Sequence, residues 1–308
     1  MSDFLPQLLQ QLFNGLSLGA IYALIAIGYT MVYGIIGMIN FAHGEIYMIG
    51  AYVGLVTLSA VGVQSGLPVW LIIALMLLVA VLVTAVYGYV VEQLAYKPLR
   101  DSPRLVPLIS AIGMSIFLQN WMALGQGARD MAVPALIPGA MRFAGGDGFE
   151  IYIPYARVLV IVVTVVLMVL LTLYIRNSRM GRASRACSQD MHMANLLGID
   201  TNRVISFTFV LGAMLAAVGG ILIALAVGKL NPFIGFIAGI KAFTAAVLGG
   251  IGSIPGAMLG GVILGIAETL AAAYISSEYK DIVAFALLVL ILMFRPTGLL
   301  GKPEVEKV

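Results

Sequence analysis

The sequence predicts an all-α, polytopic membrane protein with about eight or nine transmembrane helices in a single domain that spans residues 1–308. Of the 308 residues, 61% are apolar and only 10% are charged. A helix that crosses a bilayer needs about 20 mostly apolar residues, so this apolar content suffices for roughly nine crossings. No water-soluble fold of this size could bury so many apolar side chains. A soluble domain and a disordered chain are therefore excluded.

Apolar runs bounded by charged or turn residues predict the helices in order. The first 11 residues contain no Lys or Arg, so the first run is interpreted as a retained helix and not as a cleavable signal peptide. Two runs are interrupted, one near residues 40–45 and one by a glycine-rich turn at 249–256. The runs are 12–34, 35–62, 69–91, 107–125, 157–175, 204–228, 236–252, 255–274 and 282–294.

Basic residues predict the orientation. Of the 17 Lys and Arg residues, 11 fall in the segments 92–106 and 176–203 and in the tail after residue 294. Cytoplasmic loops carry an excess of Lys and Arg, so we expect these segments and the C-terminus in the cytoplasm. The N-terminus and the segment 126–156 are then expected outside, provided that each run crosses once. A re-entrant run would change the count.

The two interruptions are candidate pathway segments. Lipid cannot satisfy unwound backbone, so such backbone must lie within protein or line a wet cavity. Transporters often build their substrate sites in this way. The alternative is a tight turn between two ordinary helices. The candidate residues are Asn40, Phe41, His43 and Glu45 in the first segment and Gly249, Gly252, Ser253, Pro255 and Gly256 in the second.

Charged residues inside the apolar runs need a partner, a cavity or a route to the membrane surface. Lys241 is expected to extend its ammonium group to that surface. Glu45 and Glu268 are harder to explain, and two interpretations stay open. Each carboxylate could form hydrogen bonds within the fold, or it could line a substrate route, so Glu268 joins the pathway candidates.

Several chemistries are unsupported by the sequence. One cysteine, Cys187, excludes a disulfide framework and a cysteine-based metal site. The two histidines, His43 in an apolar run and His192 in the cytoplasmic loop 176–203, are expected to lie far apart and cannot share a metal or catalytic site. No Gly-x-x-x-x-Gly-Lys-Ser/Thr motif occurs, so the chain does not bind ATP through a P-loop of its own. We expect no catalytic residue, metal or cofactor here, and the net charge of +3 does not favour nucleic-acid binding.

The loop 176–203 contains a predicted amphipathic helix from Ser178, a possible N-cap, to Gly198, a possible end. One interpretation is an interfacial helix on anionic lipid. The other is a docking helix for a cytoplasmic partner. One face would carry Ala183, Cys187, Met191, Ala194 and Gly198, and another face Arg182, Arg185, Gln189 and His192.

Three strings carry a resemblance to a known family. They are Gly28–Glu45 (GYTMVYGIIGMINFAHGE), Ile109–Asn120 (ISAIGMSIFLQN) and Lys241–Ala257 (KAFTAAVLGGIGSIPGA), and the tail from Arg295 also fits. Nearly end to end, the chain resembles the branched-chain amino-acid ABC permeases, and the H-type members most closely. The resemblance implies a permease subunit, not an enzyme, of an ATP-driven importer for leucine, isoleucine and valine in the bacterial inner membrane.

The resemblance also implies partners. These are an M-type permease subunit, two cytoplasmic subunits that bind ATP and magnesium, and a periplasmic amino-acid-binding protein that docks near 126–156. The stretch that matches the family's ATPase-engaging loop contains Gly181, Arg182, Arg185, Asp190, Ala194, Leu197 and Gly198.

Two alternatives to this function remain. Urea-type relatives share the string Asn40–Gly44, so a permease for urea, short amides or other amino acids is one of them. An ion-coupled secondary transporter that works alone through Glu45 or Glu268 is the other.

Overall fold

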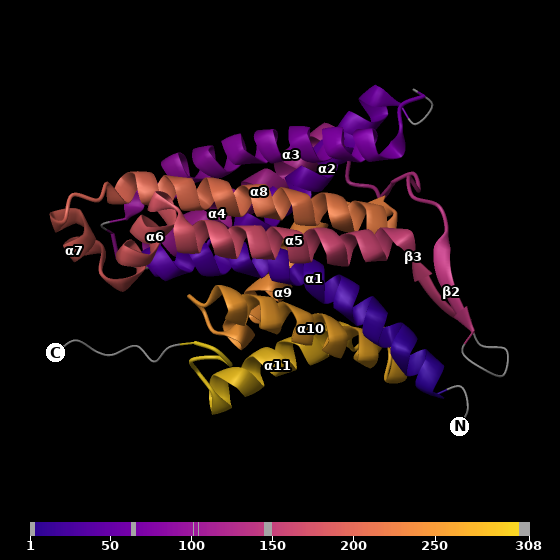
Figure 1. The fold of residues 1–308 in the computed structure, drawn as a ribbon. Helices are drawn as coiled ribbons and strands as arrows, with labels where there is room; N and C mark the ends of the chain where they lie inside the picture. The colour runs from indigo at the N-terminus through magenta and orange to yellow at the C-terminus, as the bar shows by residue number, and fades with distance from the viewer. Residues whose placement is uncertain (1–3, 63–65, 101, 104, 145–149, 302–308) are drawn as a thin grey trace.

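The structure is a computed structural model that describes residues 4–62, 66–100, 102–103, 105–144 and 150–301. Its long helices run side by side along one axis (Figure 1). Seven helices in the described residues are long and apolar enough to cross a membrane, whereas α9 and α11 are shorter. The nine are α1 (Phe4–Ile36), α2 (His43–Val61), α3 (Val69–Val91), α4 (Leu105–Gln126), α5 (Tyr155–Asn177), α8 (Thr201–Val227), α9 (Ile234–Gly249), α10 (Ile254–Tyr274) and α11 (Lys280–Phe294).

Short elements mark the two ends of the bundle. At one end lie α6 (Arg179–Gln189) and α7 (Met191–Leu196), and at the opposite end lies a hairpin of β2 (Ala140–Ala144) and β3 (Glu150–Pro154) (Figure 1). The first turns of α1 lie at the hairpin end, because Gln10 and Tyr152 exchange hydrogen bonds of 2.8 and 2.7 Å. The remaining short elements are β1 (Met131–Ala132), antiparallel to β4 (Lys229–Leu230), and η1 (Glu92–Tyr96) and η2 (Lys97–Leu99) after α3.

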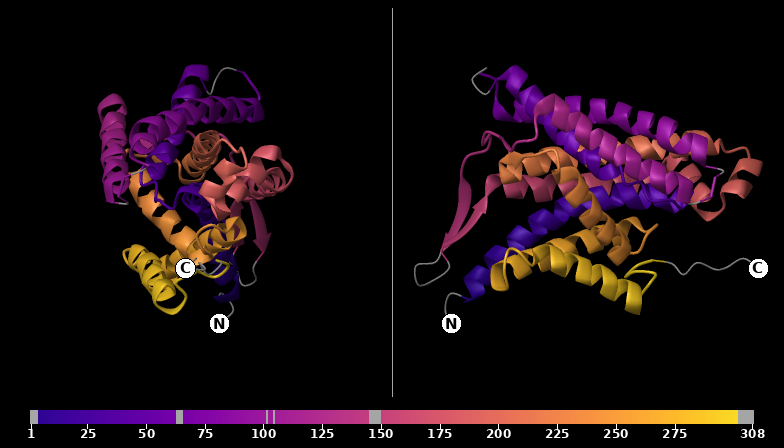
Figure 2. Two further views of the ribbon diagram at one scale, coloured as in Figure 1. Left: turned by 90° about the vertical axis from the view of Figure 1, so that its left-hand side faces the viewer. Right: turned by 180° about the vertical axis from the view of Figure 1, so that it is seen from behind.

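The centre of the bundle consists of α1, α2 and α8, which are the most buried of the long helices. In contrast, α3, α4 and α5 expose most of their apolar side chains, as helices that face lipid do. Viewed along the bundle in the left panel of Figure 2, α4 and α11 lie at its margin. Glycines bring α1 and α10 together: a Cβ on Gly265 would meet the backbone of Gly19.

The predicted helices are confirmed, with corrections at two boundaries. Helix α1 begins at Phe4 and not at residue 12, because the glutamines before residue 12 are good helix formers. The run 35–62 is not one interrupted helix. The chain leaves α1 at Gly37, whose φ is 69°, and α2 begins at His43. The break therefore covers 37–42, and Glu45 lies in a helical first turn.

The single amphipathic helix predicted for the loop 176–203 is wrong, because the structure has two helices there. The Ser178 side chain caps α6 by accepting from the Gly181 N–H at 2.9 Å. Asp190 then adopts an extended conformation and caps α7 by accepting from the Met193 N–H at 3.0 Å. A short acidic side chain in the middle of the stretch thus starts a second helix. Gly198, with a φ of 83°, follows α7 closely.

Candidate functional site

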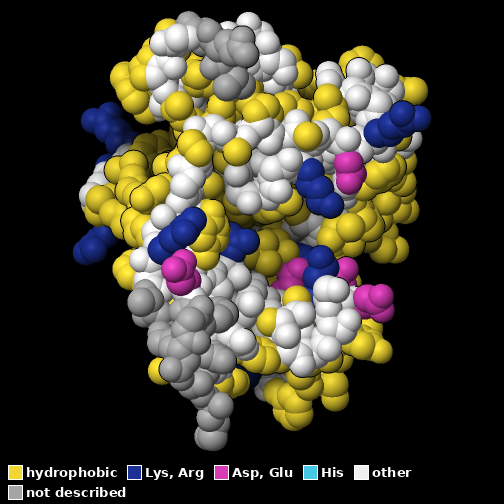
Figure 3. Space-filling model, turned by 90° about the vertical axis from the view of Figure 1, so that its right-hand side faces the viewer, with side chains coloured by type: hydrophobic (Ala, Val, Ile, Leu, Met, Phe, Trp, Pro, Cys, Tyr) yellow, Lys and Arg dark blue, Asp and Glu magenta, His cyan; other side chains and the backbone are white. Residues whose placement is uncertain are grey.

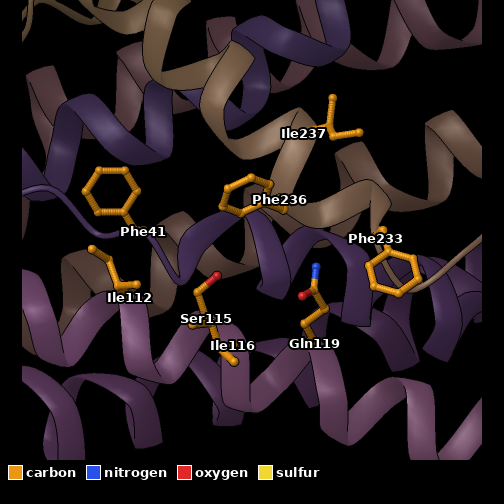
Figure 4. A pocket seen from close by; sticks show the side chains of 8 residues that line it. All are labelled: Phe41, Ile112, Ser115, Ile116, Gln119, Phe233, Phe236 and Ile237. Carbon is orange, nitrogen blue, oxygen red and sulfur yellow. The ribbon is translucent and has the colours of Figure 1, made fainter. Parts of the chain in front are cut away.

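A groove with a volume of about 520 Å³ lies between α4 and the start of α9. This volume is in the range of small-molecule sites. Most of its lining is apolar, and two polar side chains, Ser115 and Gln119, stand on the α4 wall (Figure 4). The lining residues are Phe41, Ile112, Ser115, Ile116, Gln119, Phe233, Phe236 and Ile237.

Two helix starts meet beside this groove. A Cβ on Gly44, in the first turn of α2, would collide with the backbone of Gly235 and Gly239 in the first turns of α9. Only glycine permits this approach of two helix ends. Neither start has a side-chain cap from its N-cap residue, so positive helix ends point towards the same region. Ser115, which forms a hydrogen bond with Glu45 in the first turn of α2, lies near the middle of α4. The two helix starts therefore meet midway along α4 and not at an end of the bundle.

Glu45 is a charged residue that contacts the groove wall. Its side chain is buried, and Oε1 accepts a hydrogen bond of 3.1 Å from the Ser115 hydroxyl. Oε2 has no hydrogen-bond partner among the described residues and faces the backbone of Gly235. The groove therefore has an apolar wall and one acidic point behind Ser115.

The other candidates of the first segment separate from one another. Phe41 lines the groove. Asn40 lies deeper, where its Oδ1 accepts a hydrogen bond of 2.9 Å from the Tyr96 hydroxyl. His43 packs into a gap left by Gly28, with its ring 4.9 Å from that of Tyr29. Only Phe41 and Glu45 are thus placed at or directly behind the groove.

The second segment, 249–256, forms a tight turn between α9 and α10 and lies outside the groove lining. The Ser253 hydroxyl accepts from the Gly256 N–H at 3.2 Å, and Pro255 occupies the first turn of α10. The chain after α11 then returns to this turn, with the Leu300 N–H donating to the Gly249 carbonyl at 2.8 Å. Gly252, with a φ of 90°, completes the turn. A pathway role for these residues stays a prediction.

Glu268 lies in an ion cluster that joins α1, α9, α10 and α11. The Lys241 Nζ lies 2.6 Å from Glu268 Oε1 and 2.6 Å from Asp281 Oδ1. The Tyr22 hydroxyl donates to Glu268 Oε2 at 2.9 Å. The expectation that Lys241 extends to the membrane surface is wrong, because its residue is only 3% exposed and two carboxylates hold it inside.

The α6–α7 end is the second candidate site. Cys187 and Ala194 are buried against the chain's own helices, so this small-residue face is not available to a partner. Gly181 packs on the backbone of Ile175 at the end of α5. The exposed apolar surface consists instead of Met193, Leu196 and Leu197.

Two arginines of α6 have local backbone partners. Arg182 donates to the Asn177 carbonyl at 2.9 Å, and Arg185 donates to the Ile175 carbonyl. Both cap the last carbonyls of α5, which is a usual role for basic side chains at a helix C-terminus. They connect α6 to a long helix of the bundle while remaining exposed.

Sequence reasoning missed the α4 and α9 parts of the groove. Ser115 and Gln119 are polar residues four positions apart within an apolar run, which places them on one helix face. Asn231-Pro232-Phe233 is a further helix-breaking signal, directly before α9. Among the residues that the structure describes, no group of three or more His, Cys, Asp and Glu side chains could hold a metal ion.

Comparisons with known proteins agree along the whole chain. A family model described as "Branched-chain amino acid transport system / permease component" matches residues 11–292. The permease protein LivH of Escherichia coli (strain K12), from a high-affinity branched-chain amino acid transport system, is 57% identical over 311 residues, with 100% of both chains covered. The permease protein BraD of Pseudomonas aeruginosa, also from a high-affinity branched-chain amino acid transport system, is 56% identical over 300 residues, covering 97% of this chain and 98% of BraD.

A more distant relative is the permease protein LivM of Salmonella typhimurium, which is 28% identical over 298 residues, covering 91% of this chain and 68% of LivM. The family model accounts for most of the helical bundle, including both helix starts at the groove and the α6–α7 end. This chain therefore belongs to the family of permease components of branched-chain amino acid transport systems.

Proposed function

We propose that this chain is the H-type permease subunit of an ATP-driven ABC importer that moves leucine, isoleucine and valine across the bacterial inner membrane. The observation that carries the proposal is the groove: an apolar wall suits an aliphatic side chain, and two helix starts and a carboxylate suit a zwitterion. The names of LivH and BraD favour the same cargo.

The proposed orientation puts the α6–α7 end in the cytoplasm. That end carries the basic clusters of the segments 92–100 and 176–203, as the positive-inside rule requires. The hairpin end then faces the periplasm. Figure 3 shows this end, whose surface carries both Lys or Arg and Asp or Glu side chains. With nine crossings the N-terminus lies outside and the C-terminus inside.

Each end has a proposed partner. The exposed apolar residues of α7, with the neighbouring arginines, would contact one of two cytoplasmic subunits that bind ATP and magnesium. The hairpin, whose exposed Phe143 and Tyr152 supply contact area, would receive the periplasmic amino-acid-binding protein. The similarity to LivM supports a second, M-type permease of the same fold beside this one.

The experiment is reconstitution of this chain with all four partners in proteoliposomes that contain ATP. We expect accumulation of labelled leucine that isoleucine and valine compete for, and no accumulation when ATP or the ATPase subunits are omitted. Urea and acetamide are included as test cargo. Preferential uptake of either compound, or leucine accumulation by this chain alone under a proton or sodium gradient, would replace this function by one of its alternatives.

A further inference from the structure

Of the buried glutamates in the described residues, Glu45 and Glu268 lie within the apolar helices, and their surroundings differ. Both oxygens of Glu268 have partners, from Lys241 and from the Tyr22 hydroxyl. Glu45 is 0% exposed, takes part in no ion pair among the described residues, and has one oxygen without any hydrogen bond. A buried carboxylate without a cationic partner is costly in a membrane-spanning segment, which makes Glu45 a candidate for a functional role.

The position of Glu45 connects it to the groove. Ser115, whose hydroxyl bonds Oε1, is itself part of the groove wall, and in Figure 4 its hydroxyl points towards the side on which α2 and α9 lie. On the other side, Gly235 contributes no side chain: a Cβ there would lie 2.5 Å from Oε2. Gly235 stands between two groove-lining residues, Phe233 and Phe236. Only the backbone around Gly235 thus lies between the unpartnered Oε2 of Glu45 and the groove.

We propose that Glu45 and Ser115 form the ammonium-binding point of this groove, which selects amino acids over uncharged or purely anionic cargo. This inference rests on the proposed function. The substrate ammonium group would donate hydrogen bonds to Glu45 and Ser115 and neutralise the Glu45 charge, while the aliphatic side chain lies against Phe236 and its neighbours. The substrate carboxylate would lie towards Gln119 and the start of α9.

A purely structural role makes a different prediction. The Glu45 charge could simply complement the positive end of α9, which begins at Ile234. Neutralising Glu45 would then lower stability and every activity together. An ammonium-binding role instead predicts that substrate movement is lost while the assembled importer still folds, docks its binding protein and hydrolyses ATP.

The test uses the complete importer in proteoliposomes and measures three quantities: leucine uptake, ATP hydrolysis stimulated by the loaded binding protein, and the melting temperature. For Glu45→Gln we expect about a ten-fold or greater fall in leucine moved per ATP hydrolysed, because a charge-assisted contact is lost. Glu45→Asp keeps the charge and should retain clearly more uptake than the amide. Ser115→Ala should lower uptake by a few fold.

Thr164→Val is the matched control, because the Thr164 hydroxyl is also buried and has no hydrogen-bond partner in the described part of the chain, but it lies on α5, outside the groove lining. Its uptake should equal that of the unaltered importer. Uptake by Glu45→Gln within two-fold of the unaltered importer overturns the proposal. So does a parallel loss of uptake, ATP hydrolysis and melting temperature that Glu45→Asp does not relieve. If Glu45→Gln does not fold, the leucine uptake of Ser115→Ala is compared with that of Thr164→Val, and equal uptake by these two variants overturns the proposal. Failure of the unaltered importer to move leucine instead refutes the proposed function.

Discussion

The ion cluster around Lys241 makes the sharpest stability prediction. Lys241 on α9 bridges Glu268 on α10 and Asp281 on α11, with 2.6 Å from its Nζ to each carboxylate. The side chains of Lys241 and Glu268 are 4% and 5% exposed, whereas that of Asp281 is 45% exposed. The substitution Lys241→Met keeps an unbranched side chain of similar size and removes the ammonium group, with its charge and its N–H donors.

The expected magnitude follows from these exposures. Without Lys241, the Glu268 carboxylate stays buried with only the Tyr22 hydroxyl as a donor. Removing one partner of a buried ion pair typically costs about 3–5 kcal/mol, because the other charge stays uncompensated. The half-exposed Asp281 can be hydrated, so its contribution is that of a surface pair, about 0–1 kcal/mol. The cost of Lys241→Met therefore lies almost entirely in the bond to Glu268.

The assay is equilibrium unfolding of the purified chain in mixed micelles, followed by circular dichroism, on a double-mutant cycle. Lys241→Met should lower the free energy of unfolding by about 3–5 kcal/mol. Glu268→Gln leaves Lys241 paired with Asp281 and should cost less, and the double variant should lose less than the sum of the two single costs. Asp281→Asn is the internal control and should cost about 1 kcal/mol or less. A cost below about 1 kcal/mol for Lys241→Met, or additive single costs, would refute the argument.

Three further predictions concern packing and access. Gly265→Leu should prevent α1 and α10 from approaching and abolish recovery of monodisperse protein, whereas Gly125→Ala, with no atom near its Cβ, should leave recovery unchanged in size-exclusion chromatography. Burial raises the pKa of the Cys187 thiol, so less thiolate is present at neutral pH. Maleimide should therefore label Cys187 at least about ten-fold more slowly than it labels the exposed position 188 in the double variant Cys187→Ala, Ser188→Cys. Equal labelling rates would contradict the buried placement of Cys187. Leu197→Asp, at a side chain 79% exposed, should weaken co-purification of the ATPase subunits without lowering the melting temperature, and unchanged co-purification would exclude α7 from that contact.

Hydropathy predicted the helices well because membrane crossing fixes both their length and their composition. Hydropathy did not predict how deep within the bundle each helix begins. The predicted runs 204–228 and 236–252 leave the stretch before α9 as a loop, yet the structure places the first turn of α9 against Gly44 and Glu45, beside the middle of α4. Depth depends on how helices pack against one another, and the glycines that permit this packing are common throughout the sequence. The turn at 249–256 shows the converse: its strong local signal corresponds to a tight connection between α9 and α10 that lies outside the groove lining.

The two intramembrane glutamates show why the site itself could be predicted only in part. In the sequence each is one acidic residue within an apolar run, so the same two interpretations apply to both. Their difference comes from residues distant in the chain: Tyr22 is 246 positions from Glu268, and Ser115 is 70 positions from Glu45. Glu268 meets a lysine and serves as a junction of four helices, whereas Glu45 meets only a hydroxyl beside an apolar groove. An unsatisfied charge, which no one-dimensional pattern reveals, is therefore the feature that distinguishes Glu45, the residue that we propose for ligand binding, from Glu268 in its ion cluster.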